Sequence, residues 1–177
     1  MRPVLTPAMD RSSFRTLAAV TAGMTFALIL VGIYTKATAA GLACNAQWPG
    51  TNGFLGLLPA DAPCFIEWSH RALAMFTGFA ILGTTVAAWR GGFDRRVRYA
   101  SAVALAVLPA QVLLGANTIF NYGPIAQVLH HGAALTIFTG LVVATTVAFA
   151  GGGNPPGEAA DAAGSDAGDR ETRTAGD

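Results

Sequence analysis

Charged residues are scarce in this sequence. Only 12% of its 177 residues are charged and 53% are hydrophobic, whereas an ordinary soluble domain carries about a quarter charged residues. A chain this short and this apolar has too little polar surface to cover itself in water. The composition therefore excludes an ordinary soluble domain and indicates a lipid bilayer as the solvent.

Residues typical of several other functions are also few. The net charge is +1 and no basic patch with interleaved aromatic residues is present, so we expect no nucleic-acid partner. The two cysteines and three histidines are too few and too scattered for a zinc site. The chain also lacks a CxxC pair, which a thiol oxidoreductase often carries.

Four stretches contain no charged residue: residues 17–35, 72–89, 99–120 and 132–149. Each has roughly the 18 apolar residues that a helix needs to cross about 30 Å of hydrocarbon. Pro109 predicts a kink in the third. The first leads into a polar loop and three further spans, which favours a retained helix over a cleaved signal peptide. The sequence predicts an all-α, integral membrane four-helix bundle over residues 16–150.

The basic residues predict the orientation of this bundle. The positive-inside rule places arginine-rich segments in the cytoplasm. We therefore expect a multi-pass protein of the cell membrane with both termini inside and an outer loop at about residues 37–65. Residues 1–15 form the cytoplasmic N-terminus, and residues 151–177, rich in Gly, Ala and Asp, form a disordered acidic tail. The basic residues in question are Arg2, Arg11, Arg15, Arg90, Arg95, Arg96 and Arg98.

Two histidines are expected at similar depths in the membrane. The second and fourth helices run in the same direction, and His70 and His130 each lie about five residues into their helix, or roughly 7–8 Å along it. Imidazoles on facing helices of a bundle are the arrangement that a bis-histidine heme requires. A helix-to-helix hydrogen bond is the simpler alternative. His131 is turned about 100° from His130, and periodicity does not choose between them.

Charged residues beside these histidines are candidates for chemistry, because intramembrane charges are costly. Glu67 precedes His70 by three residues and Arg71 by four, so all three share a helix face. The carboxylate can orient the imidazole, accept protons, or simply pair with Arg71. Lys36 closes the first span, and Gln111 is a polar residue within the third.

The two cysteines, Cys44 and Cys64, both fall in the predicted outer loop. An oxidising compartment permits a disulfide there, which would tie the exit of the first helix to the entry of the second. A structural disulfide is the preferred interpretation, and a redox-active pair is the alternative.

Four motifs resemble those of the heme A synthase family. Residues 31–50, VGIYTKATAAGLACNAQWPG, resemble the first-helix signature, with Lys36 in the place of its basic residue. Residues 67–71, EWSHR, are similar to E-x-x-H-R of the second helix. Residues 111–118, QVLLGANT, resemble Q-x-x-x-G-x-x-T, and residues 128–134, VLHHGAA, resemble L-H-x-x-x-A. The motifs stand in family order over about residues 16–150.

The resemblance implies conversion of heme O to heme A, by oxidation of a ring methyl to a formyl group, for cytochrome oxidase biogenesis. It implies that His70 and His130 ligate a heme, heme B or the substrate heme O, and that Glu67 is catalytic. From their charge we place Lys36 and Arg71 near the heme carboxylates.

The family usually has eight helices, and four are found in this sequence. The resemblance therefore predicts a half-length form that works as a homo-oligomer, with a second half-length chain, or as a single half that suffices by itself. Heme O synthase and cytochrome oxidase are further expected partners. The alternatives are a b-type cytochrome, a non-catalytic heme-handling assembly protein and a thiol–disulfide membrane oxidoreductase.

Overall fold

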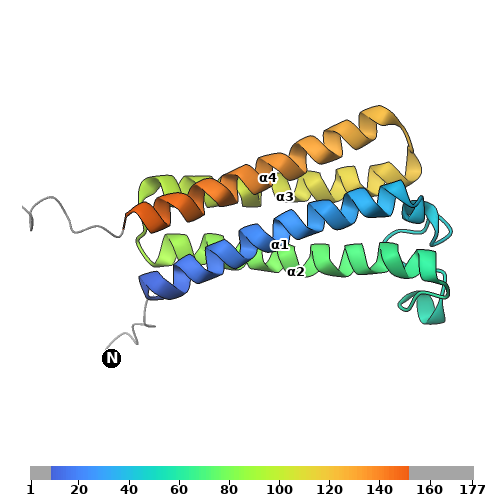
Figure 1. Ribbon diagram of the computed structural model, residues 1–177, viewed down its shortest axis with the longest axis horizontal. Coiled ribbons are helices and arrows are strands. Elements are labelled where there is room, and N and C mark those ends of the chain that lie inside the picture. Colours follow the sequence, from blue (N-terminus) through green and yellow to red (C-terminus); the bar gives the residue numbers. More distant parts are fainter. Residues whose placement is uncertain (1–8, 152–177) are drawn as a thin grey trace, which may run out of the picture.

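The computed structural model describes residues 9–151, which form an antiparallel bundle of four long helices (Figure 1). All four are long and apolar enough to cross a membrane, which confirms the predicted all-α membrane bundle. Each helix packs on its neighbours in the chain and α1 also packs on α4, so the four close into a ring. The helices are α1 (Arg11–Ala37), α2 (Ala62–Arg90), α3 (Arg95–Phe120) and α4 (Pro124–Ala150), with short 3₁₀ turns η1 (Ala40–Leu42) and η2 (Phe54–Gly56) between α1 and α2.

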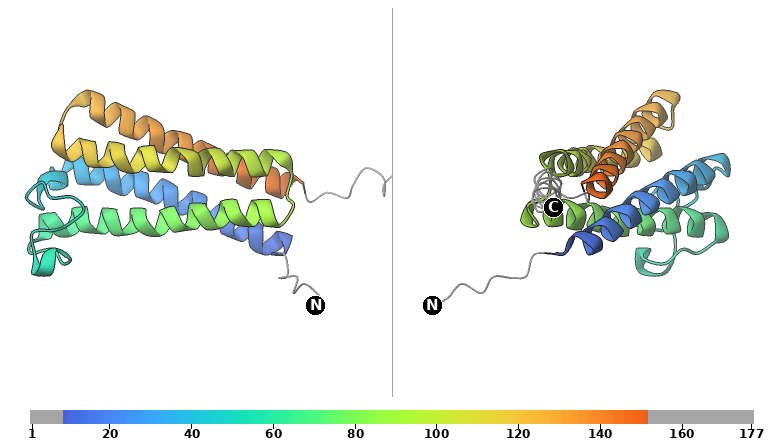
Figure 2. Two further views of the ribbon diagram at one scale, coloured as in Figure 1. Left: turned by 180° about the vertical axis from the view of Figure 1, so that it is seen from behind. Right: turned by 60° about the vertical axis from the view of Figure 1, so that its left-hand side comes forward.

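The bundle has two ends that differ in their connections (Figure 2). We call one the arginine end: it holds the start of α1, the end of α4 and the short α2–α3 link at residues 91–94. We call the other the loop end: it holds the long α1–α2 connection, residues 38–61, and the α3–α4 link, residues 121–123. The cytoplasmic placement of the arginine end stays a prediction, and the predicted tail lies outside the described residues apart from Gly151.

Aspartate caps make the helices longer than the charge-free stretches. Asp61 accepts a hydrogen bond of 2.7 Å from the backbone N–H of Cys64, so α2 begins at Ala62 and Cys64 lies in its first turn rather than in the loop. Asp10 and Asp94 cap α1 and α3 in the same way. Of the four acidic residues within residues 9–151, Glu67 is the one that does not cap a helix.

The core lies towards the arginine end. Small residues bring the helices close together: a Cβ at Gly140 of α4 would lie only 2.8 Å from the carbonyl oxygen of Ala100 on α3. α3 continues through Pro109, which has no N–H to donate. Two apolar clusters fill this end: Phe14, Ala18, Ala88, Val97, Ala144 and Ala148, then Ala22, Ile81, Ala104, Ile137 and Leu141.

Buried hydroxyl groups complete the packing between these clusters. Thr21 of α1 and Thr84 of α2 are fully buried and their hydroxyl oxygens lie 3.0 Å apart. The Thr85 hydroxyl donates to the carbonyl oxygen of Ser101 on α3 over 3.0 Å. Because lipid offers no partner for such groups, they bond between or within helices.

Candidate functional site

The candidate residues from the sequence gather in the loop-end half of the bundle, beyond the apolar clusters. Glu67, His70 and Arg71 lie within the first ten residues of α2, and Lys36 lies in the last turn of α1. His130 lies near the start of α4. Three helices therefore supply the polar side chains of one region.

The His70 ring rests against a glycine of the neighbouring helix. A Cβ at Gly32 of α1 would lie 3.0 Å from His70 Cε1, closer than side chains normally approach, and 3.6 Å from Nδ1. Gly32 thus leaves the space that the ring occupies, and we call a glycine in this position the seat of the histidine. The Nδ1 atom is buried and has no hydrogen-bond partner among the described residues.

The His130 ring has an equivalent seat on α3. A Cβ at Gly115 would lie 3.2 Å from His130 Cε1 and 3.7 Å from Nδ1. The amide nitrogen of Gln111, one turn before Gly115 on α3, lies 3.3 Å from His130 Nε2. His130 Nδ1 is buried and, within residues 9–151, has no partner.

His131 is used differently from His130. Its Nδ1 lies 2.7 Å from the backbone carbonyl oxygen of Gln127, one turn earlier in α4. A carbonyl oxygen only accepts, so Nδ1 carries the proton and donates this bond. The structure thus separates two residues that helical periodicity alone did not separate: the ring of His130 sits against α3, and that of His131 is tied to its own helix.

The two histidines lie deeper in their helices than expected. His70 stands eight residues after Ala62, the first residue of α2, or about 12 Å along the axis at 1.5 Å per residue. His130 stands six residues after Pro124, the first residue of α4, or about 9 Å along it. Measured from their helix starts, the depths agree to within about 3 Å. The difference from the expected 7–8 Å arises because the Asp61 cap and Pro124 start both helices early.

Glu67 and Arg71 form a nearly buried ion pair. Arg71 Nε donates to Glu67 Oε1 over 2.8 Å, and only 8% of the glutamate side chain is exposed. Arg71 Nη1 also donates to the backbone carbonyls of Gly50, at 2.8 Å, and Pro49, at 3.3 Å. Arg71 therefore joins α2 to the long loop, and the pairing that the i, i+4 spacing allowed is observed. Glu67 Oε2 accepts no hydrogen bond from the described residues.

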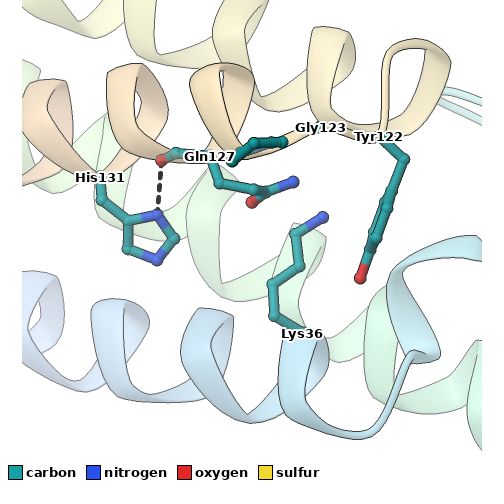
Figure 3. A pocket seen from close by; sticks show the side chains of 6 residues that line it. Lys36, Tyr122, Gly123, Gln127 and His131 are labelled. Carbon is teal, nitrogen blue, oxygen red and sulfur yellow. Dashed lines mark hydrogen bonds between the residues drawn. The ribbon is translucent and has the colours of Figure 1, made fainter.

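Lys36 forms no salt bridge with this ion pair, and its side chain reaches towards α4. Its ammonium nitrogen lies 4.1 Å from the centroid of the Tyr122 ring, a cation–π contact. A pocket of about 380 Å³ surrounds it at the loop end (Figure 3). The lining residues are Lys36, Tyr122, Gly123, Pro124, Gln127 and His131.

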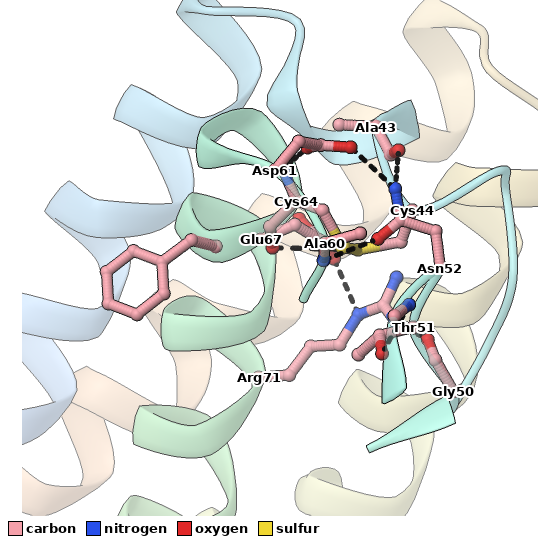
Figure 4. The surroundings of a disulfide bond; sticks show 12 residues. Ala43, Cys44, Gly50, Thr51, Asn52, Ala60, Asp61, Cys64, Glu67 and Arg71 are labelled. Carbon is pink, nitrogen blue, oxygen red and sulfur yellow. Dashed lines mark hydrogen bonds and ion pairs between the residues drawn. A yellow bond between two sulfur atoms is a disulfide. The ribbon is translucent and has the colours of Figure 1, made fainter. Parts of the chain in front are cut away.

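Cys44 and Cys64 form the predicted disulfide, which joins the long loop to the first turn of α2 (Figure 4). The two cysteines are 1% and 0% exposed. Asn52, whose amide donates to Asp61 over 2.6 Å, holds the loop over the disulfide. Such burial hinders attack by an external thiolate, which favours a structural role over redox exchange.

The two helical hairpins, α1–α2 and α3–α4, repeat one pattern. Gly32 and Thr35 of α1 have the spacing of Gly115 and Thr118 of α3, and both glycines seat a histidine ring. Glu67 stands three residues before His70, as Gln127 does before His130. The sequence interpretation missed Gln127, and this repeated spacing is the signal that points to it.

Fold and site together define a multi-pass membrane bundle with glycine-seated histidines on its second and fourth helices. The model of the cytochrome oxidase assembly protein family matches residues 15–168. The chain belongs to that family. No solved structure matches it significantly.

Curated relatives carry two different names. A protoheme IX farnesyltransferase of Halobacterium salinarum is 41% identical over 131 residues, which cover 72% of this chain and 28% of that protein. A heme A synthase of Bacillus licheniformis is 31% identical over 132 residues, 73% of this chain and 43% of that protein. A heme A synthase of Staphylococcus epidermidis is 31% identical over 130 residues, 71% of this chain and 42% of that protein. The chain thus spans less than half the length of each of these relatives.

Proposed function

We propose that the chain acts in heme A synthesis, oxidising a ring methyl group of heme O to a formyl group for cytochrome oxidase biogenesis. The observation that carries this proposal is the pair of histidines, His70 and His130, each seated against a glycine of a neighbouring helix with a buried, unpartnered ring nitrogen. Two of the relatives above are named heme A synthase, and they supply the reaction class.

The donor set fits a heme. Neutral imidazoles are common axial ligands of heme iron, and helix bundles hold such groups between facing helices. Buried imidazole nitrogens without a partner are costly, so a ligand that uses the rings would remove an unfavourable feature. His70 and His130 would hold the heme, which when bound supplies the methyl group to be oxidised and an iron that exchanges electrons.

Glu67 is the residue that we assign to proton movement. Oxidation of a methyl to a formyl group takes one oxygen atom from water and releases protons and electrons, and the electrons pass to an external acceptor. Glu67 lies one helical turn from His70, and it is the one carboxylate of the described helices that does not cap a helix end. Arg71 occupies its Oε1 atom, which leaves Oε2 to accept a proton.

The proposal is tested by chromatography and mass spectrometry of hemes extracted from cells that make heme O and express this chain. We expect heme A or its hydroxylated precursor. Glu67→Gln keeps the size of the side chain and removes its charge, so heme should stay bound while product falls by about 100-fold or more, the range typical for lost general acid–base catalysis. Undiminished product in Glu67→Gln would refute the role of Glu67, and no product from the unmodified chain, either alone or co-expressed with a second half-length chain, would refute the enzyme.

A partner chain is part of this proposal. The matched region is 43% of the Bacillus licheniformis heme A synthase, and we propose that a second copy of this chain or a second half-length chain pairs with the bundle. The Halobacterium salinarum relative is named protoheme IX farnesyltransferase, which makes a heme O synthase a natural donor of substrate. If the purified chain binds heme O or heme B without converting it, the heme-handling or b-type cytochrome alternative is favoured. Co-expression with a second half-length chain then decides between these alternatives and an enzyme made of two chains.

A further inference from the structure

The pocket between α1 and α4 has no role in the assignments made so far. It opens at the loop end, where Lys36 reaches from α1 towards Gln127 on α4 (Figure 3). Its other lining residues belong to the α3–α4 link and to the first two turns of α4. Gln127 lies one helical turn from His130, so the pocket adjoins the histidine site.

The Gln127 side chain lacks any partner for its amide. Both Nε2 and Oε1 are buried without a hydrogen bond among the described residues, which is unfavourable for a polar group. In the first hairpin the equivalent residue, Glu67, bonds to Arg71 four residues later. In the second hairpin that position is His131, which donates to the Gln127 backbone instead. The amide is therefore left for a ligand.

The charges beside the pocket do not balance. Arg71 pairs with Glu67, whereas the Lys36 ammonium forms no salt bridge within residues 9–151 and rests on the Tyr122 ring. Glu67 is near: a Cβ at Gly41 would lie 3.8 Å from Glu67 Oε2 and 3.9 Å from Lys36 Nζ. One carboxylate thus stands against two cations, which leaves one positive charge for an anion to neutralise.

We propose that this pocket binds a carboxylate group of heme, with the Lys36 ammonium and the Gln127 amide N–H donating to its oxygens. The proposal rests on the proposed heme function. A planar carboxylate accepts two donors at once, and Gln127 stands one helical turn before His130, a proposed heme ligand. Arg71, bound to Glu67 and the loop carbonyls, is then a structural cation, and Lys36 is the one that recognises the substrate.

The test compares heme B with its dimethyl ester, in which both carboxylates are blocked. The full chain is produced without heme, placed in nanodiscs of neutral lipid and titrated with each form by absorbance. We expect the free acid to bind roughly tenfold more tightly than the ester, the value of one charge-assisted contact. Lys36→Gln should remove this preference and leave ester affinity unchanged, Gln127→Leu should reduce it, and Lys36→Arg should retain it. Arg90→Gln, which removes an exposed cation at the arginine end, is the matched control and should behave as the unmodified chain.

Four results would overturn the inference. Equal binding of acid and ester by the unmodified chain shows that no carboxylate is recognised, while the heme function stands. Equal weakening of both forms by Lys36→Gln shows that the lysine acts on the fold rather than on the acid. Loss of the preference when anionic phospholipid replaces neutral lipid shows that a lipid phosphate is the pocket's ligand. Absence of any heme binding by the unmodified chain refutes the proposed function itself, and this inference with it.

Discussion

The two ends of the bundle differ in how their buried polar groups find hydrogen-bond partners. At the arginine end the helices meet through small and apolar side chains, and the buried hydroxyls find partners on their own or neighbouring helices. At the loop end, histidine, glutamine and arginine side chains take the place of such a core. Seven buried side-chain atoms of the described residues lack a partner, and only Arg98 Nε belongs to the arginine end. The others are His70 Nδ1, Arg71 Nη2, Gln111 Oε1, Gln127 Nε2, Gln127 Oε1 and His130 Nδ1.

This difference places the residues that stabilise the fold at one end of the bundle and the candidate functional residues at the other. Inside a bilayer an unsatisfied polar group costs several kcal/mol, so a helix pair that keeps such groups needs other atoms to bond with them. Apart from Arg98 Nε, the described buried polar side-chain atoms of the arginine end are satisfied by protein atoms alone. The loop end holds its side chains in place with glycine seats, a disulfide and the Glu67–Arg71 pair, and it leaves donors and acceptors for a ligand.

The largest expected effect is that a substitution at one end lowers heme binding without unfolding the chain, whereas a substitution at the other end lowers stability without loss of heme. His130→Ala removes a proposed iron ligand, so heme retained after purification should fall by at least tenfold while the helical fold persists. Phe14→Ala removes a fully buried ring stacked 4.0 Å from that of Phe93. It should lower unfolding free energy by about 3 kcal/mol, the lower end for such changes, with heme content per folded chain unchanged.

Heme absorbance and thermal unfolding, measured on the same samples, separate these outcomes. His131→Ala is the matched control for His130→Ala, because the neighbouring ring is bonded to its own helix and its loss should leave the heme spectrum in place. If Phe14→Ala depletes heme as strongly as His130→Ala does, the two ends are not independent and the comparison fails.

The fold was largely predictable because a helix needs roughly 18 apolar residues in a row to cross a bilayer. Four charge-free stretches were long enough to span, and the structure places a helix over each. The helix starts were missed because charged residues in a first turn, such as Arg11 and Arg95, are helical once an aspartate caps the turn. Charge marks a residue as exposed in a sequence, but at a helix end it says little about backbone conformation.

The candidate site was predictable in its ionisable residues and less so in its neutral ones. The spacing of Glu67 and Arg71 allowed the ion pair that is observed, and the position of both cysteines near the predicted outer loop predicted the disulfide. Gln127 was missed because it carries no charge and, unlike Gln111, lies outside the four charge-free stretches, where a polar residue stands out. The separate directions of Lys36 and Arg71 were also missed, since they depend on where the loop carbonyl of Gly50 comes to lie, which spacing along the chain does not determine.

A smaller effect is expected from the glycine seats, which sharpen the comparison within the loop end. Gly32→Ala places a Cβ 3.0 Å from His70 Cε1, so the ring must shift by a few tenths of an ångström. We expect a several-fold loss of heme affinity, because an iron ligand tolerates little displacement. Gly23→Ala, in the same helix with nothing within 4 Å of the new Cβ, is the control. Equal affinity of the two variants for heme B would show that Gly32 is not a seat.

The smallest effect belongs to the hydroxyl pair that joins α1 and α2 within the arginine-end core. Thr21 and Thr84 are fully buried with their oxygens 3.0 Å apart, and the Thr21 hydroxyl also lies 2.8 Å from the carbonyl oxygen of Leu17. Thr84→Val keeps the shape and removes the interhelical bond. Because such bonds contribute about 0.6 kcal/mol in membrane proteins, a double-mutant cycle with Thr21→Val should give a coupling of that size. A coupling well above 2 kcal/mol would mean that polar contacts, rather than small-residue packing, hold the arginine end together.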